Sequence, residues 1–169
     1  MKTPRLPVLT VLLLLGLALT GCSSDDNPAA PAAGAHNAST TDGGLQLTVG
    51  TDKASYAFGE DVVVTMVLRN TGNAPIALDF QRGDPARYPN LSVNIRSDDN
   101  YSHFVDGDGT RDKTSLGAGE SIRTTLLWEQ QISRSNRQPV ARGTYRVVGF
   151  IDFDDRDQLK VEDLFIELK

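Results

Sequence analysis

From Leu45 onward, apolar and polar residues alternate along the chain with a period of two. The alternation is fullest in residues 61–69 (DVVVTMVLR), where four apolar side chains fall on one face: Val62, Val64, Met66 and Leu68. Alternation over this length is typical of a strand with one buried face, and the β-branched residues support that interpretation. No segment shows a sustained helical stripe. The pattern therefore predicts a chain built of strands.

Further strands are expected where the same alternation recurs between turn residues. The candidate strands are residues 45–49, 91–96, 120–129, 144–153 and 159–168. The turn cluster 70–73 predicts that residues 74–80 return as the hairpin partner of 61–69, and the turn after Phe153 predicts a second hairpin. About seven to nine short strands at this spacing indicate an all-β fold, an immunoglobulin-like antiparallel β-sandwich.

Two aromatic residues are expected to fill the core of this sandwich. Tyr145 follows Gly143 and Thr144 at the start of the penultimate strand. That position is typical of the tyrosine corner, in which the hydroxyl bonds to nearby backbone. Trp128 ends the preceding strand and is the natural large core residue. For both residues, packing is favoured over ligand stacking, because buried aromatic side chains mostly serve the core.

The first 21 residues have the features of an export signal. Lys2 and Arg5 precede an apolar run from Val8 to Leu19. The run is shorter than the roughly 20 residues needed to cross a bilayer, but it suits the apolar region of a secretory signal. Residues 19–22 (LTGC) resemble the lipobox of bacterial lipoproteins, in which the chain is cut before a cysteine that carries acyl chains. The resemblance implies that Cys22, the single cysteine of the chain, is a lipid anchor and not a free thiol.

Residues 22–44 are expected to form a disordered tether that begins at the anchor. They are rich in Ser, Ala, Pro, Gly and Asp and hold no aromatic or large aliphatic residue, so they cannot bury enough apolar surface to offset their ordering entropy. The predicted organisation is a lipoprotein signal peptide over 1–21, this tether over 22–44 and one β-sandwich domain over 45–169.

The lipid anchor implies a location in the bacterial cell envelope. In a host with two membranes, the outer membrane is favoured, with the domain facing the periplasm, because Ser23 and not an Asp follows Cys22. In a host with one membrane, the domain is expected on the outer face of the cell membrane.

Charge and composition disfavour several classes of function. The formal net charge is −5, and removal of residues 1–21 leaves 15 Lys and Arg against 22 Asp and Glu. This balance disfavours nucleic acid or an anionic lipid surface as the main partner, since both reward clustered Lys and Arg. No enzyme is expected, because the predicted domain has one histidine (His103), no thiol and no Gly-x-Ser-x-Gly elbow.

An acidic turn near the middle of the chain offers oxygen ligands of the kind that Ca²⁺ uses. Asp106 and Asp108 are the candidate ligands. The spacing fails as an EF-hand, because Arg111 stands where that loop needs Gly and Gly117 where it needs a bidentate Glu. A solvated turn is therefore favoured over a calcium site, and no cofactor is expected.

The domain resembles the BsuPI family, the intracellular proteinase inhibitors of bacilli. The similarity is carried by residues 68–72 (LRNTG), 75–80 (PIALDF), 116–121 (LGAGES) leading to Trp128, and 139–147 (PVARGTYRV). The resemblance implies an immunoglobulin-like fold and inhibition of a proteinase by non-covalent binding. Two stretches depart from the family: residues 81–90 are longer than its usual turn, and residues 98–104 (DDNYSHF) replace its tryptophan-containing segment.

Loop 130–142 (QQISRSNRQPVAR) is the candidate protease contact. An inhibitor needs a stiff exposed loop, because preorganisation removes the ordering cost of binding. Arg134, Arg137 and Arg142 would suit a protease with an acidic specificity pocket, although a loose loop of this sequence would itself be cut by trypsin. The alternative is a non-inhibitory module for adhesion or scaffolding. The expected partners are the membrane, through the anchor, and a protease or another envelope protein.

Overall fold

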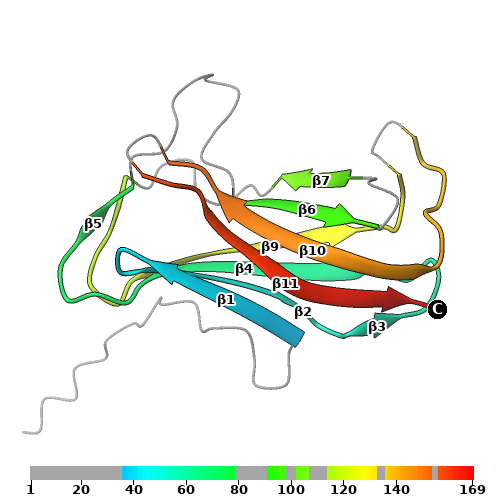
Figure 1. Ribbon diagram of the computed structural model, residues 1–169, viewed down its shortest axis with the longest axis horizontal. Coiled ribbons are helices and arrows are strands. Elements are labelled where there is room, and N and C mark those ends of the chain that lie inside the picture. Colours follow the sequence, from blue (N-terminus) through cyan, green and yellow to red (C-terminus); the bar gives the residue numbers. More distant parts are fainter. Residues whose placement is uncertain (1–35, 79–90, 98–101, 107–113, 133–135, 154–155) are drawn as a thin grey trace, which may run out of the picture.

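The structure is a computed structural model, and it describes residues 36–78, 91–97, 102–106, 114–132, 136–153 and 156–169. These residues form two facing β-sheets and a small third sheet, without any helix (Figure 1). Eight of the described strands have five residues or more. The predicted all-β fold, an immunoglobulin-like β-sandwich, is therefore confirmed.

The first sheet has four antiparallel strands in the order β1-β2-β4-β9. They are β1 (His36–Asp42), β2 (Leu45–Thr51), β4 (Val62–Asn70) and β9 (Ser121–Trp128). The second sheet has the order β3-β11-β10-β6-β7, and only β3 and β11 run parallel. Its strands are β3 (Ser55–Tyr56), β6 (Ser92–Arg96), β7 (Ser102–Asp106), β10 (Gly143–Ile151) and β11 (Leu159–Leu168). The third sheet pairs β5 (Ile76–Ala77) with β8 (Ser115–Leu116).

The core lies between the two larger sheets and is built from the alternating faces that the sequence predicts. Strand β4 contributes four side chains without exposed area: Val62, Val64, Met66 and Leu68. The register sets Leu47 of β2 beside Leu68, and Leu126 of β9 beside Val64. The second sheet adds Val93, Ile95, Val147 and Ile166. Each such side chain stabilises the fold by roughly 1.5–3 kcal/mol relative to its exposure to water.

Trp128 and Tyr145 pack against each other inside the sandwich, as expected. Their ring centroids lie 5.4 Å apart with the planes tilted by 59°, and both side chains are buried. The Tyr145 hydroxyl donates a hydrogen bond of 2.7 Å to the carbonyl of Ala141. This contact confirms the tyrosine corner.

A buried asparagine organises the turns at one end of the sandwich. Asn70 has no exposed area, and its Nδ2 donates to the carbonyls of Ala74 at 2.7 Å and Leu116 at 3.0 Å. Its Oδ1 accepts a bond of 2.9 Å from the Gly72 amide. Two of the segments that carry the resemblance to BsuPI proteins are thus joined by a structural side chain.

The predicted hairpin between residues 61–69 and 74–80 is wrong. Ile76 and Ala77 pair with β8, whereas the neighbours of β4 are β2 and β9. The turn after β4 leads the chain out of the first sheet, because Asn70 binds carbonyls of both the turn and β8. The end of the expected partner, from residue 79, lies outside the described residues.

The predicted tether is also wrong over residues 36–44. Strand β1 occupies most of this stretch and pairs with β2 from His36 opposite Thr51 to Asp42 opposite Leu45. Gly43 and Gly44 form the two-residue turn with φ of 53° and 81°, and hairpin turns with positive φ at both positions favour glycine. The prediction of disorder from polar composition failed because a polar strand can be held by main-chain hydrogen bonds, which do not depend on apolar side chains. Residues 1–35 lie outside the described part of the chain.

Gly149 marks a close approach of the two larger sheets. A Cβ atom at this position would lie 2.3 Å from Cγ2 of Val49 and 3.0 Å from Cε of Met66. Both neighbours belong to the facing sheet, on β2 and β4. Because Gly149 has no side chain, the two sheets can approach each other closely at this point.

We expect Gly149→Ala to lower the free energy of unfolding by about 1–3 kcal/mol, because the added methyl group overpacks the core. Urea denaturation followed by Trp128 fluorescence measures the change. The control is Gly117→Ala, whose Cβ would lie 3.4 Å from Oε2 of Glu120, an ordinary contact. It should shift the same free energy by less than about 0.5 kcal/mol. Equal losses in the two variants would contradict the proposed role of Gly149.

Candidate binding surface at the loop end

The described residues of loop 129–142 (129–132 and 136–142) lie at one end of the sandwich together with turn 57–60 and Lys169. We call this end the loop end. It lies around the C-terminus and β3 in Figure 1. The Phe58 amide donates to the carbonyl of Lys169 at 2.9 Å, and the Lys169 amide donates to the carbonyl of Tyr56 at 2.9 Å. Turn 57–60 is thereby fixed to the last strand of the chain.

The base of loop 129–142 is closed by main-chain hydrogen bonds. Gln131 and Pro139 form an antiparallel bridge, and the Ile132 amide donates to the carbonyl of Gln138 at 2.9 Å. The Val140 amide donates to the carbonyl of Gln130 at 2.9 Å. The two sides of the loop are therefore held together at residues 130–132 and 138–140.

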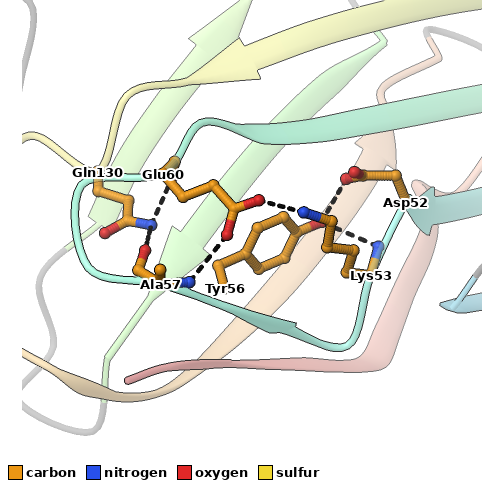
Figure 2. Close-up of polar contacts among 6 residues, drawn as sticks. All are labelled: Asp52, Lys53, Tyr56, Ala57, Glu60 and Gln130. Atoms are coloured by element: carbon orange, nitrogen blue, oxygen red, sulfur yellow. Dashed lines mark hydrogen bonds and ion pairs between the residues drawn. The ribbon is translucent and has the colours of Figure 1, made fainter.

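Gln130 links the loop to turn 57–60, as Figure 2 shows. Its side chain is buried, with 1% exposed, and its backbone has a φ of 55°, which is uncommon for a residue other than glycine. Nε2 donates to the carbonyls of Ala57 at 3.0 Å and Glu60 at 2.6 Å, and Oε1 accepts from the Gly59 amide at 2.8 Å. One side chain thus satisfies three main-chain groups of the turn.

The polar residues beside this turn also hold the backbone in place (Figure 2). The buried Tyr56 hydroxyl donates to Oδ1 of Asp52 at 2.5 Å and accepts from the Lys53 amide at 3.1 Å. Burial, and then the bond to Asp52, raise the pKa of Tyr56, so the phenol stays a neutral donor. Lys53 forms an ion pair with Glu60, and Glu60 accepts a second bond from the Ala57 amide at 2.9 Å.

Each of these polar groups has a partner that stabilises the turn. The hydrogen bond to Lys53 lowers the pKa of Glu60, and the bond to Glu60 raises the pKa of Lys53. The carboxylate therefore stays charged and bonded. The arrangement is suited to fixing the shape of a surface on which another molecule can dock.

Of the three arginines predicted to contact a protease, the structure describes two, Arg137 and Arg142. Arg142 is exposed and its Cζ lies 5.2 Å from the ring centroid of Phe58, which is itself 40% exposed. A guanidinium over an aromatic face is held by cation–π attraction. Arg137 is exposed farther along the loop, and Arg134 lies outside the described residues. Among the described residues, Arg137 and the pair of Phe58 and Arg142 are thus large exposed side chains at the loop end.

The other predicted site residues are Cys22, Asp106 and Asp108. Cys22 and Asp108 lie outside the described residues, and Asp106 is the last residue of β7. In the described part of the chain, no three His, Cys, Asp or Glu side chains gather as metal ligands would. No helix long and apolar enough to span a membrane occurs among the described residues.

Sequence reasoning missed Gln130 and Phe58. A glutamine after a strand carries no signal of burial, because its role depends on a turn some 70 residues away in the chain. Phe58 stands in the turn sequence AFGE, and an aromatic residue in such a sequence is a signal of surface exposure.

The described residues define an all-β sandwich with a loop whose base is closed by main-chain bonds at one end. The chain belongs to the family described as "Family of unknown function (DUF7974)", which it matches over residues 39–169. No curated protein matches the chain.

Three solved structures have similar parts. The alkylpurine DNA glycosylase AlkC of Pseudomonas fluorescens is 18% identical over 70% of this chain and 28% of its own, with a TM-score of 0.40. The sporulation control protein Spo0M of Bacillus subtilis is 18% identical over 75% and 50%, with a TM-score of 0.44. The β-glucosidase EmGH1 of Erythrobacter marinus is 14% identical over 80% and 16%, with a TM-score of 0.39. This chain spans at most half the length of these proteins.

We expect Gln130→Ala to lower the free energy of unfolding by about 1–3 kcal/mol, because it removes three hydrogen bonds between the loop and part-buried main-chain groups of turn 57–60. Trypsin should also cut after Arg137 faster than in the parent protein. Urea denaturation and timed proteolysis with mass spectrometry measure the two effects. Gln138→Ala removes an exposed glutamine of the same loop and should change neither. An unchanged cutting rate in Gln130→Ala would show that Gln130 does not order the loop.

Proposed function

We propose that this protein is a lipid-anchored, non-enzymatic binding protein of the bacterial cell envelope that recognises another protein through its loop end. The observation that carries the proposal is the fixed base of loop 129–142, closed by main-chain bonds and joined to turn 57–60 by Gln130. A loop whose base is already held in place loses less conformational entropy when it binds. The polar groups beside the loop hold the backbone of turn 57–60 in place.

The anchor in this proposal is Cys22, on the strength of the LTGC sequence. Acyl chains stabilise attachment by about 0.8 kcal/mol per buried methylene, and more than one chain is needed for stable attachment. Residues 23–35 separate the anchor from β1, and 13 residues reach at most about 45 Å when extended. The domain would therefore work close to its membrane: the outer membrane on its periplasmic side, or the outer face of a single cell membrane.

Two forms of the binding function follow from different residues of the loop end. In the first, the protein inhibits a proteinase, as the resemblance to BsuPI proteins implies, and the exposed Arg137 enters an acidic specificity pocket. In the second, binding is non-inhibitory and serves adhesion or scaffolding. The exposed Phe58 under Arg142 favours this second form, because aromatic residues and arginines often carry the energy of protein interfaces.

We expect Cys22→Ala to abolish membrane attachment, because the acyl chains have no other thiol to join. Metabolic labelling with an alkyne analogue of palmitate, followed by membrane fractionation, measures this. Ser23→Ala should keep both the label and the membrane fraction. Label retained in Cys22→Ala would rule out the anchor.

We expect the full chain in neutral detergent to inhibit a trypsin-like proteinase at a one-to-one ratio. Arg137→Ala should weaken inhibition by about tenfold or more, because it removes the charge that pairs with the acidic pocket. Residual proteinase activity against a small chromogenic substrate is the measurement. The control is Arg69→Ala, an exposed arginine on β4.

The outcomes separate the two forms. Inhibition that is lost in Arg137→Ala but kept in Arg69→Ala supports the inhibitor. Cleavage within loop 129–142 without inhibition contradicts it and leaves the non-inhibitory form. In that case, Phe58→Ala should reduce capture of envelope proteins while the fold is unchanged.

A further inference from the structure

The outward face of the second sheet places two arginines directly opposite each other. Arg96 on β6 pairs in register with Arg146 on β10, and both side chains are exposed. Residues opposite each other in antiparallel strands have Cα atoms only about 4.5–5.5 Å apart, and like charges at such positions destabilise a sheet. We call these two residues the arginine pair.

A third residue completes a compact surface. Phe165 of β11 pairs in register with Arg146, and the Cζ of Arg146 lies 5.1 Å from the Phe165 ring centroid. The Phe165 side chain is 43% exposed. A guanidinium that stacks on a ring keeps its in-plane N–H groups free for an acceptor. Nε2 of His36 lies 2.5 Å from the carbonyl oxygen of Phe165, which ties β1 to β11 at this residue.

The arginine pair has no ion-pair partner among the described residues. The ion pairs there are Lys53 with Glu60, Lys160 with Glu162, and Lys169 with Glu167. Neither Arg96 nor Arg146 takes part in any of them. The two positive charges are thus available on an open sheet face of a chain whose net charge is −5.

Glu162, an acid whose pKa is affected by both arginines, is already paired with a lysine. A bulge in β11 sets Glu162 and Asp163 together opposite Val148, since Val161 pairs with Gly149 and Leu164 with Val147. Glu162 bonds to Lys160, which is the main cause of its lowered pKa, and the charges of Arg146 and Arg96 lower that pKa further. The positive charge of the arginine pair therefore reaches Glu162, although neither arginine forms an ion pair with it.

We propose that Arg96, Arg146 and Phe165 form a docking site for a carboxylate-bearing segment of a partner protein. A carboxylate can accept parallel hydrogen bonds from a guanidinium fork, and its charge relieves the repulsion within the arginine pair. Phe165 supplies apolar contact beside the charges. This site is separate from the loop end, so it does not depend on the function proposed for loop 129–142.

The acids around the site favour a local carboxylate over a broad anionic surface. Glu162, Asp163 and Glu167 are exposed on β11, on either side of Phe165 in the sequence. A membrane of anionic lipids would bring its charge close to these carboxylates as well as to the arginines. A single acidic side chain or chain terminus can meet the arginines alone.

The probe is a fluorescein-labelled peptide of alternating Glu and Ser residues, mixed with the full chain in neutral detergent at low salt. Fluorescence anisotropy should show affinity at least about tenfold above that for the matching Gln and Ser peptide, because charged hydrogen bonds are the strong ones. The double variant Arg96→Ala with Arg146→Ala should lose about tenfold or more in affinity. Its free energy of unfolding should stay equal or rise, since the like-charge contact is gone.

The matched control is the double variant Arg69→Ala with Arg123→Ala, which removes the same charge from the first sheet. Arg69 pairs with Ser121 and Arg123 with Val67, so neither faces another arginine. This control should keep the affinity within about twofold. Equal losses in both doubles would mean general charge attraction and would overturn the proposal. Displacement of the peptide by short-chain phosphatidylglycerol, but not phosphatidylcholine, would assign the surface to lipid and also overturn it.

Should the first double variant fold poorly, Arg96→Lys with Arg146→Lys serves instead. It keeps both charges and removes the guanidinium forks, so peptide affinity should still fall several-fold. Full affinity in the lysine variant would exclude fork recognition. Arg137→Ala should leave peptide binding unchanged, which separates this site from the loop end.

Discussion

Apolar contact between the two large sheets holds this fold together. The chain has a single cysteine, so no disulfide within it can join the sheets, although exported domains often use such bonds. The packing between the two sheets must therefore be close, as it is at Gly149. A methyl group there would overlap Val49 of the facing sheet. Strand faces rich in Val, Leu, Ile and Met then fill most of the space between the sheets.

Two buried amides extend this order from the core to the ends of the sandwich. Asn70 binds two carbonyls and one amide of the turns around β5 and β8. Gln130 does the same for the turn that presents Phe58. Buried main-chain groups need partners, and a side-chain amide can supply both donor and acceptor at once. Hydrogen bonds to main-chain groups thus order turns at both ends of the sandwich, as they do in the sheets.

The two proposed surfaces differ in how they relate to stability. At the loop end, the polar residues support the fold and leave Arg137, Arg142 and Phe58 exposed. On the second sheet, Arg96 and Arg146 lie opposite each other, and like charges at such positions disfavour the pairing of strands. A feature that works against stability and persists in an exposed position is often explained by binding. Both surfaces suit a protein that acts by contact with other molecules.

The sequence by itself determined the strand content and the buried face of each main strand, because alternation with a period of two directly records which side chains meet the core. It also indicated Tyr145 and Trp128 as core residues. A short turn let it predict the pairing of residues 144–153 with 159–168, which the structure confirms. It could not determine the pairing of residues 74–80, for which the predicted partner was wrong, and it could not reveal β1, whose polar residues are held by main-chain bonds. Gln130 and the arginine pair became visible only in three dimensions. Their roles arise from residues distant in the chain, and tertiary structure alone decides which distant residues meet.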